Sequence, residues 1–485
     1  MAGFAAATLL LSACATGAAE RALRVAGAPR SGPPPASSKA SPTGPPSSLG
    51  PTVAAVDVSN ATGPQSETSV AVDPSNPRIL LAGSNTLVSP TMRAYSSVDG
   101  GRTWTSRDDP PLSRSTSGYS SDPAVGIDAR GRQYFAFLQI HQEGHGHLAS
   151  VFVASRPSPG SDWTTPLQPV SPHGADASDD KPTLTVDAGA SSPHRGRVYA
   201  AWSRFGPSGE EILVASSDDG AGSWSPPHVV VAGPSVSDAN LAVSSGGDLY
   251  AAWLDKTAIW VARSTDGGRT FGPAIIADIR TPGDLKCRGF GVSIPAQPHR
   301  CVRPVPTVTV DHSTGARSGR VYVTYANGGA NLSEDVFVAS FTRDLRPLTG
   351  YPTGGAPVQV NPPDGPSPSD QFLPASAVDP STGLLWVCFY DTGTDASRVT
   401  ARFSCTDSAD GGRTWAPVRA VASVPSNETR AGADTGKHGN EYGDYESVAA
   451  EGGFAHPVWT DGRSDGSSPL REEVFTATIT AGPGG

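Results

Sequence analysis

Short runs of β-branched, aliphatic and aromatic residues alternate with turn residues along most of the chain, and one longer pattern of this kind recurs. Each copy starts with a polar or acidic residue, continues through a short strand of alternating polar and apolar positions, turns, and then reaches an aromatic-rich strand. Seven copies can be counted, roughly 55 to 75 residues apart, a little longer than the usual propeller repeat. The copies are SETSVAVDPSNPRILLAGS, SDPAVGIDARGRQYFAFLQ, DKPTLTVDAGASSPHRGRVYAAWS, DANLAVSSGGDLYAAWLD, RPVPTVTVDHSTGARSGRVYVTYA, SDQFLPASAVDPSTGLLWVCFYD and DYESVAAEGGFAHPVWTDG.

A nine-residue phrase follows several of these copies. It occurs as SSVDGGRTW (96–104), SSDDGAGSW (216–224), RSTDGGRTF (263–271) and DSADGGRTW (407–415). A third strand such as EILVASS precedes it, and a fourth such as PPHVVVAG follows it. Four antiparallel strands per copy, repeated around an axis, predict an all-β protein with the β-propeller architecture.

The last copy predicts how the ring closes. EEVFTATIT supplies its third strand, and the chain then ends without a fourth. Residues 52–58, TVAAVDV, precede the first copy and offer the missing strand. Closing the ring with both ends of the chain removes two exposed sheet edges, so we expect seven blades, with six as the alternative.

Composition agrees with this fold and excludes one class of partner. Gly and Pro account for 101 of 485 residues (55 plus 46), as is typical of a turn-rich β protein. The formal net charge of −10 arises from dispersed acidic residues, and no Lys/Arg stripe is present that would neutralise phosphates. We therefore expect no nucleic-acid partner.

The N-terminal stretch predicts export. The apolar run in MAGFAAATLLLSACATG ends in Leu-Ser-Ala-Cys, which resembles the lipobox of bacterial lipoproteins. The resemblance implies a signal peptide over 1–14 and lipidation of Cys14; an ordinary secretory signal is the alternative. Residues 15–50 are rich in Pro, Ser and Gly and predict an extended tether, followed by a single propeller over 51–485. Membrane contact is then expected only through the lipid.

Four further cysteines predict two disulfides, since an even number in an exported chain favours bridges over metal ligands. Cys287 and Cys301 bracket one Pro-rich loop. Cys388 and Cys405 occupy facing positions of two successive strands when the copies are aligned, a separation that a disulfide can span.

The pattern S-x-D-x-G-x-T-W within the phrase resembles the Asp-box, or BNR repeat, of the sialidase superfamily. Residues 97–104, 264–271 and 408–415 match it, and 217–224 is a degraded copy with Ala221 at a usual glycine. We expect its aspartate to accept backbone hydrogen bonds within a turn, its glycines to adopt positive φ, and its aromatic residue to fill the space between neighbouring sheets. In the family these turns lie far from the substrate site.

Function is expected at the opposite end, where the innermost strands begin around the channel mouth. Most copies place a charge there, and Asp122 and Asp180 are candidates for substrate binding. An aspartate in this position also caps tight turns, which is the structural alternative. The cluster HQEGHGH (141–147) predicts a solvated loop, and we expect neither a metal nor a cofactor.

The densest cluster is GNEYGDYESVAAEGGFAHPVWTDGR (439–463). Sialidases use a tyrosine nucleophile activated by glutamate, an aspartate as acid/base, and three arginines that clamp the substrate carboxylate. The resemblance implies that Tyr442 or Tyr445 pairs with Glu446 and that Asp444 lies beside them. It further implies an arginine clamp of Arg204, Arg303 and Arg463.

Two functions follow from these observations. The first is an exo-sialidase-type glycoside hydrolase that acts on glycans. The second is a non-catalytic surface propeller that binds glycan or protein at the channel mouth, which is favoured by the absence of the family's Arg-Ile-Pro motif before the first blade. In either case we expect a monomer.

Overall fold

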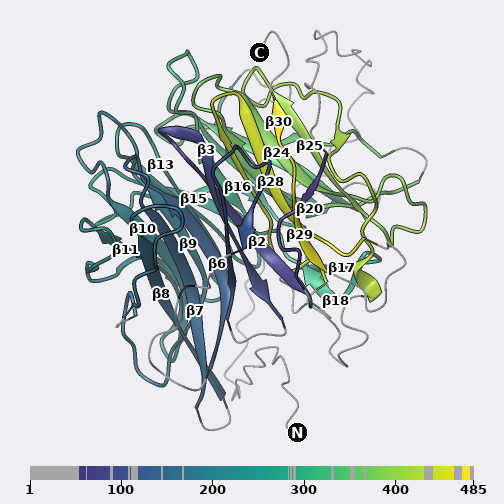
Figure 1. Cartoon of the computed structure of the whole chain (residues 1–485). Coiled ribbons are helices and arrows are strands. Elements are labelled where there is room, and N and C mark those ends of the chain that lie inside the picture. Colours follow the sequence, from purple (N-terminus) through teal and green to yellow (C-terminus); the bar gives the residue numbers. More distant parts are fainter. Residues whose placement is uncertain are drawn as a thin grey trace, which may run out of the picture. The chain divides into compact units, whose positions relative to one another are not determined.

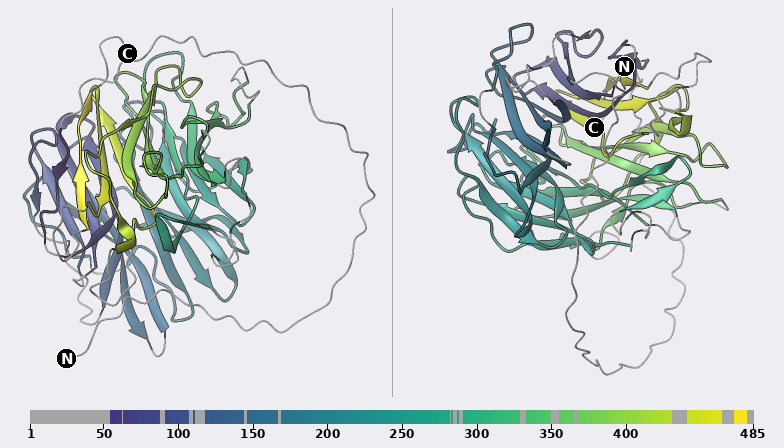
Figure 2. Two further views of the ribbon diagram at one scale, coloured as in Figure 1. Left: turned by 90° about the vertical axis from the view of Figure 1, so that its right-hand side faces the viewer. Right: turned by 90° about the horizontal axis from the view of Figure 1, so that it is seen from below.

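Seven antiparallel sheets, counted within the described residues, surround a central axis in the computed structural model (Figures 1 and 2). The structure describes residues 54–480 except 62, 88–90, 107–109, 111–117, 144–145, 167–168, 282, 284–286, 288–290, 329–332, 350–354, 365–366, 431–440 and 464–471. The predicted all-β propeller with seven blades is confirmed, and six blades is excluded.

Each blade begins with its innermost strand, and the strands follow in chain order. Blade 1 comprises β2 (Gln65–Asp73), β3 (Asn76–Thr86), β4 (Arg93–Ser97) and β5 (Thr105–Ser106), and blade 2 comprises β6 (Tyr119–Ile127), β7 (Gln133–Glu143) and β8 (Gly146–Arg156). Blade 3 comprises β9 (Ser178–Val186), β10 (Val198–Gly206), β11 (Gly209–Ser217) and β12 (His228–Gly233), and blade 4 comprises β13 (Ser237–Val243), β14 (Leu249–Leu254), β15 (Ala258–Ser264) and β16 (Ile275–Ile279).

Blades 5 to 7 complete the ring. Blade 5 comprises β19 (Thr307–Val310), β20 (Val321–Gly328), β21 (Glu334–Phe341) and β22 (Val358–Gln359), and blade 6 comprises β23 (Gln371–Val378), β24 (Leu385–Asp391), β25 (Arg402–Ser408) and β26 (Arg419–Ala420). Blade 7 comprises β27 (Ser447–Glu451), β28 (Phe454–Asp461), β29 (Glu473–Thr476) and β1 (Val56–Asp57), with β30 (Ile479–Thr480) paired to the other end of β28. Outside the blades lie the hairpin β17 (Val292–Ile294) and β18 (Gln297–Val302) and the short 3-10 helix η2 (Glu428–Arg430).

Ring closure follows the sequence prediction. β1 pairs antiparallel with β29, with Val56 opposite Thr476 and Asp57 opposite Phe475. Val58 N–H then donates to the Val474 carbonyl at 2.8 Å, and the Val58 side chain is buried against both blade 1 and blade 7. The first strand of the chain therefore completes the last blade.

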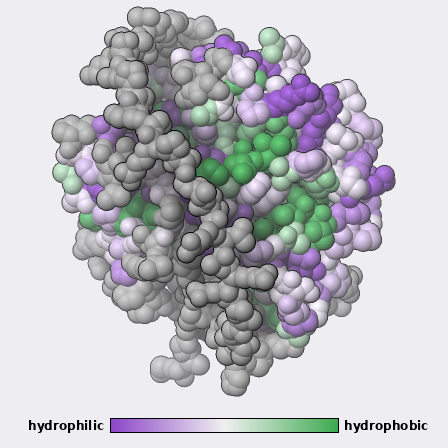
Figure 3. All heavy atoms as spheres, turned by 180° about the vertical axis from the view of Figure 1, so that it is seen from behind, coloured by the Kyte–Doolittle hydropathy of each residue, from purple (hydrophilic) through white to green (hydrophobic). Residues whose placement is uncertain are grey.

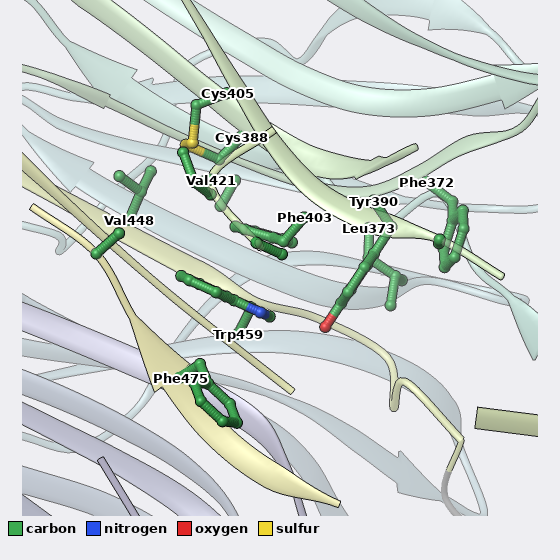
Figure 4. Close-up of a cluster of buried hydrophobic side chains, with 14 of the residues drawn as sticks. Phe372, Leu373, Cys388, Tyr390, Phe403, Cys405, Val421, Val448, Trp459 and Phe475 are labelled. Atoms are coloured by element: carbon green, nitrogen blue, oxygen red, sulfur yellow. A yellow bond between two sulfur atoms is a disulfide. The ribbon is translucent and has the colours of Figure 1, made fainter. Parts of the chain in front are cut away.

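Hydrophobic clusters between neighbouring sheets form the core. Between blades 6 and 7, the Phe403 ring stacks on the Trp459 ring with centroids 5.2 Å apart, and the Trp459 ring also stacks on that of Phe475 at 6.3 Å (Figure 4). Polar side chains on the innermost strands add links between blades: Ser69 Oγ accepts from Val125 N–H at 3.0 Å, and Asn240 Oδ1 accepts from Val308 N–H at 2.9 Å. The outer strands β12 and β16 expose the apolar side chains of Val229 and Ile279. Figure 3, which shows the face opposite to that of Figure 1, has hydrophobic residues grouped among hydrophilic ones.

The nine-residue phrases form the expected turns between third and fourth strands. Asp99 Oδ1 accepts from the N–H groups of Arg102 and Thr103 at 3.0 Å, and Asp99 Oδ2 accepts from the Thr103 hydroxyl at 2.6 Å. Despite burial, these bonds lower the pKa of Asp99 to about 2. Equivalent bonds bind Asp219, Asp266 and Asp410, and Trp104, Trp224, Phe271 and Trp415 pack against interblade clusters.

Both predicted disulfides are confirmed. Cys287–Cys301 has a Cα–Cα distance of 5.8 Å, and Cys388 lies directly opposite Cys405 in the β24–β25 pairing at 4.0 Å. Two disulfides indicate a protein that folds in an oxidising, exported environment.

Cys14 and the 15–50 segment lie outside the described residues. Within the described ranges, no helix has the length and apolar character that crossing a bilayer requires.

Substitution Val58→Pro tests ring closure. It removes the N–H that bonds Val474 and disturbs a buried side chain, so we expect a loss of about 1–3 kcal/mol in the free energy of unfolding. The measurement is urea unfolding of the full chain. Ala54→Pro is the control, because Ala54 is exposed and precedes β1. Equal stability of both variants would show that β1 does not contribute to closure.

Candidate functional site

The channel mouth lies where the innermost strands begin, and a bulge recurs there. In blades 1 to 4 and 6 the pairing register shifts at this point, and a non-glycine residue adopts positive φ. These residues are Glu67, Asp122, Lys181, Asp238 and Leu373, with φ of 58°, 59°, 48°, 57° and 48°. Such backbone costs on the order of 1–3 kcal/mol per residue and clusters at functional sites. The bulge therefore marks the mouth as a candidate site.

The hairpin β17–β18 covers one side of the mouth. It leaves the ring after blade 4 and packs Ile294, Ala296 and Val302 in one cluster with Phe372 and Leu373 of blade 6. Its Gln297 side chain donates to the Gly443 carbonyl and accepts from Tyr442 N–H, both at 3.2 Å, at the approach to blade 7 (Figure 1). The disulfide Cys287–Cys301 holds the hairpin base.

The opposite side of the mouth carries charge. Blades 7, 1, 2, 3 and 4 present polar residues at their inner strand starts, while β18 contributes Arg300 and the segment after it contributes Arg303. We call this set the mouth cluster: Glu67, Asp122, Asp180, Lys181, Asp238, Arg300, Arg303, Asp444 and Tyr445. The predicted residues Asp122, Asp180, Arg303, Asp444 and Tyr445 are thus brought together.

Arg300, from β18, organises the blade 7 and blade 1 side. Its Nε and Nη2 donate to the two oxygens of Asp444 at 2.9 and 2.5 Å, and Nη2 also donates to Glu67 Oε1 at 2.8 Å. Burial alone would raise the pKa of Asp444, but Arg300 lowers it below its usual value. Asp444 is therefore ionised at neutral pH.

Two other carboxyls have the opposite behaviour. Burial raises the pKa of Glu67 to about 8, assisted by the charges of Asp122 and Asp444 and opposed by Arg300. Burial likewise raises the pKa of Asp180 to about 8, assisted by Asp122 and Asp238 and opposed by Arg303. Arg303 donates to Asp238. The mouth thus holds neutral and ionised carboxyl groups side by side.

Tyr445 lies among these carboxyls. Lys181 Nζ, from blade 3, sits 3.2 Å from the centre of the Tyr445 ring, which comes from blade 7 across the channel. The Tyr445 hydroxyl is buried and has no hydrogen-bond partner among the described residues. Burial and the nearby carboxylates, Asp122 foremost, raise its pKa well above 10, so the phenol is neutral. A buried hydroxyl without a protein partner is suited to receive one from a ligand.

Tyr442 and Glu446 lie elsewhere. Tyr442 is fully buried against Phe372 and Tyr390, and its hydroxyl donates to the Ser426 carbonyl at 3.1 Å. Glu446 accepts from the Tyr390 hydroxyl at 2.6 Å, from Thr460 N–H at 2.9 Å, and from Thr68. Tyr445 thus lies against Lys181 of blade 3, whereas Glu446 is held by residues of blades 1, 6 and 7. Among the described residues, no hydrogen bond joins Glu446 to either tyrosine predicted to pair with it.

The three predicted arginines do not converge. Arg204 binds both oxygens of Asp179 at 2.7 and 3.0 Å, and Arg463 binds Asp461 at 2.6 Å while lying over the Phe475 ring. Only Arg303 belongs to the mouth. Sequence reasoning missed Arg300, although its place beside Cys301 in an insertion between two blades is a signal that could have identified it.

No protein-family profile and no curated protein sequence matches the chain. Among solved structures, a protein of unknown function from Dyadobacter fermentans aligns with 13% identity and a TM-score of 0.48, over 89% of this chain and 99% of the other. An alpha-L-arabinofuranosidase from Fusarium graminearum aligns with 12% identity and a TM-score of 0.46, over 88% and 98%. The intramolecular trans-sialidase from Ruminococcus gnavus aligns with 12% identity and a TM-score of 0.45, over 69% and 90%.

The prediction of a loop at 141–147 is wrong for most of the segment, because His141–Glu143 end β7 and Gly146–His147 begin β8, with His141 opposite Leu148 and Gln142 opposite His147. The side chains of 142–147 lie outside the described residues. Across the described part of the chain, no group of three His, Cys, Asp or Glu residues is arranged to hold a metal.

A second set of buried carboxyls lies behind the mouth, near η2. Glu428 Oε1 accepts from the Ser426 hydroxyl at 2.5 Å and from Gly462 N–H, and burial raises the pKa of Glu428 to about 8. Glu472 is 1% exposed, and neither of its carboxyl oxygens has a partner among the described residues. Burial raises the pKa of Glu472 well above its usual value.

These raised pKa values predict that stability falls as pH rises from about 4.5, the usual pKa of a glutamate, to about 8. Between these values the folded state keeps a proton that the unfolded state has lost, so each such group removes on the order of 1 kcal/mol of stability per pH unit. Glu428→Gln should reduce the slope, measured by urea unfolding at several pH values. Asp176→Asn, at an exposed turn, is the control. A slope unchanged by Glu428→Gln would contradict the assignment.

Proposed function

We propose that the chain is a glycan-processing propeller, a glycoside hydrolase that acts at the uncovered side of its mouth. One observation carries the proposal: the neutral Tyr445 hydroxyl, which has no hydrogen-bond partner among the described residues, lies among carboxyls whose pKa values differ widely. Glycosidic bonds are cleaved by acid and base carboxyls whose environments separate their pKa values.

Asp180 is suited to the role of general acid. Its carboxyl keeps its proton to about pH 8 and is half-buried at the mouth. In this role Asp180 donates its proton to the glycosidic oxygen as the bond to the sugar breaks. Asp122, from the neighbouring blade, accepts from the Ser121 hydroxyl at 2.6 Å and is close enough for its charge to raise the pKa of Asp180. As the second carboxyl it takes the proton of the water that attacks the sugar; burial raises the pKa of Asp122 too, and the Ser121 hydrogen bond opposes that rise. The Tyr445 hydroxyl binds the sugar.

The charges favour a neutral sugar over sialic acid. Arg300 is bound to the Asp444 carboxylate and to the Glu67 carboxyl, and Arg303 is bound to Asp238, so these guanidinium groups are already engaged by carboxyl groups of the chain itself. A substrate carboxylate would also meet the negative charges of Asp444 and Asp238. Release of sialic acid, implied by the resemblance, is therefore the less favoured form of this activity.

A non-catalytic glycan-binding propeller is the second candidate. It is supported by the ion pairs themselves, because Arg300 engages two carboxyls that acid/base chemistry would otherwise use. In that case the mouth recognises a glycan without cleaving it.

Hydrolysis of fluorogenic glycosides tests the enzyme proposal. The panel contains arabinofuranoside, galactoside, xyloside and sialoside. Asp180→Asn should lower kcat by about 10²–10⁴-fold on whichever substrate is turned over, because the general acid is lost. Tyr445→Phe should weaken turnover, while Tyr442→Phe, the same chemical change in the core, should leave it intact. No turnover of any substrate above a boiled control would favour the binding alternative, to be followed by glycan-array screening.

The pH dependence of turnover supplies a separate prediction. Because Asp180 must be protonated to act as an acid, kcat should be sustained at neutral pH and fall as pH rises through about 8. The measurement is a kcat profile from about pH 5 to 10, corrected for unfolding by a parallel stability series. An activity that rises through this range would assign Asp180 the role of base instead.

A further inference from the structure

A groove of about 480 Å³ lies at the other end of blade 3 from the mouth. It is lined by residues that flank the ends of β10, β11 and β12 and by one residue of the blade 4 turn, namely Arg197, Ser216, Asp218, Asp219, Trp224, His228 and Arg269 among others. Asp180 begins the same blade at the mouth, whereas Arg197 and Asp218 stand at the opposite ends of their strands. The groove is thus separate from the mouth cluster.

The polar walls of the groove are held in place before any ligand binds. Arg197 Nε and Nη2 donate to the two oxygens of Asp218, both at 2.7 Å, and Nη1 donates to the Gly267 carbonyl of the blade 4 turn at 3.4 Å. The Asp219 carboxylate accepts from the Ser223 hydroxyl at 2.7 Å and from the Ser223 N–H at 2.9 Å, which fixes its position. A preorganised wall lowers the entropic cost of binding.

The charges of the groove balance. Arg197 and Arg269 oppose Asp218 and Asp219, and both carboxyl groups are ionised because their hydrogen bonds lower their pKa values, that of Asp219 to about 2. A charged ligand gains no net attraction from two positive and two negative groups. Paired donors and acceptors instead match a ligand that carries several hydroxyl groups.

Trp224 provides the apolar part. It is half-buried, packed at one edge against the cluster between blades 2 and 3, and it lines the groove beside Ser216 and Ser225. Those two serines are fixed by backbone hydrogen bonds, since Ser225 N–H donates to the Ser216 carbonyl at 2.8 Å. An indole beside fixed polar groups suits the apolar face of a sugar ring, and the groove volume lies within the range of small-molecule sites, about 300–1,000 Å³.

We infer that this groove is a second carbohydrate site, which binds one or two neutral sugar residues on Trp224 between Arg197–Asp218 and Arg269. It does not depend on the proposed hydrolase activity, since none of its residues belongs to the mouth cluster. A neutral glycan held here would keep the protein on a polysaccharide while the mouth engages another chain.

Binding of neutral disaccharides to the full chain tests this inference. The probes are lactose, maltose, cellobiose and xylobiose, and 3′-sialyllactose serves as the anionic counterpart of lactose. Binding is measured by isothermal titration calorimetry and by ligand-detected NMR. We expect at least one neutral disaccharide to bind with Kd on the order of 1 mM. Sialyllactose should bind no more tightly than lactose.

Variants locate the binding. Arg269→Ala and Asp218→Ala are surface changes and should each weaken binding by about five-fold or more. Arg102→Ala is the matched control, because Arg102 occupies the same turn position in blade 1. Asp180→Asn, in the mouth, should leave this binding unchanged.

Three results would overturn the inference. The first is no binding of any neutral disaccharide at about 20 mM. The second is binding that Asp180→Asn abolishes and Arg269→Ala does not, which would place the sugar in the mouth. The third is equal loss in Arg269→Ala and Arg102→Ala, which would show a general charge effect. Failure of the mouth variants to affect hydrolysis would bear only on the proposed enzyme.

Discussion

The pairing of β1 with β29 is the contact on which the rest of the structure depends. It ties the two ends of the chain together, since β1 leads directly into blade 1 while pairing with blade 7, and without it the edge of β29 would be unpaired and only side-chain contacts would hold blade 7 against blade 1. The mouth cluster draws residues from blades 7, 1, 2, 3 and 4, so its geometry requires that blade 7 be held against blade 1. Thr68 of blade 1 reinforces the contact with blade 7, because its hydroxyl lies within hydrogen-bond distance of Glu446 and lies 2.7 Å from the Val458 carbonyl.

Ring closure alone would give a mouth of near sevenfold symmetry, and the hairpin β17–β18 breaks it. Where the hairpin packs, the blade 6 bulge carries Leu373, an apolar residue that completes the cluster beneath it. At the equivalent bulges of blades 1 to 4 stand Glu67, Asp122, Lys181 and Asp238. The same bulge therefore contributes to hydrophobic packing in blade 6 and to the charged mouth in blades 1 to 4. The type of residue at the positive-φ position determines which of the two roles it has.

Repetition explains how much could be predicted from the sequence. The blade pattern, the turn phrases, the closing strand and the Cys388–Cys405 pairing all follow from aligning copies, since equivalent residues occupy equivalent places. Alignment of the copies could predict only those site residues that occupy equivalent positions in several blades. Asp122 and Asp180 are such residues, and they lie at the mouth as the alignment predicts. Tyr442 and Glu446 were misplaced because they belong to an irregular approach to blade 7, where the direction of each side chain is not set by any other copy. Arg300 belongs to an insertion with no counterpart in the other blades, so alignment offered no register for it.

The mouth and the groove illustrate two uses of buried or half-buried charge. In the groove, Arg197 and Asp218 meet in a bidentate pair near the surface, where charges cancel and leave a rigid polar wall. In the mouth, carboxyls from five blades outnumber the cations, so Arg300 and Arg303 can satisfy only some of them. The remaining carboxyls respond to burial by retaining protons, as Asp180 does. An excess of carboxyls over arginines is unfavourable for stability alone, yet it is the condition under which a propeller mouth holds a proton donor at neutral pH.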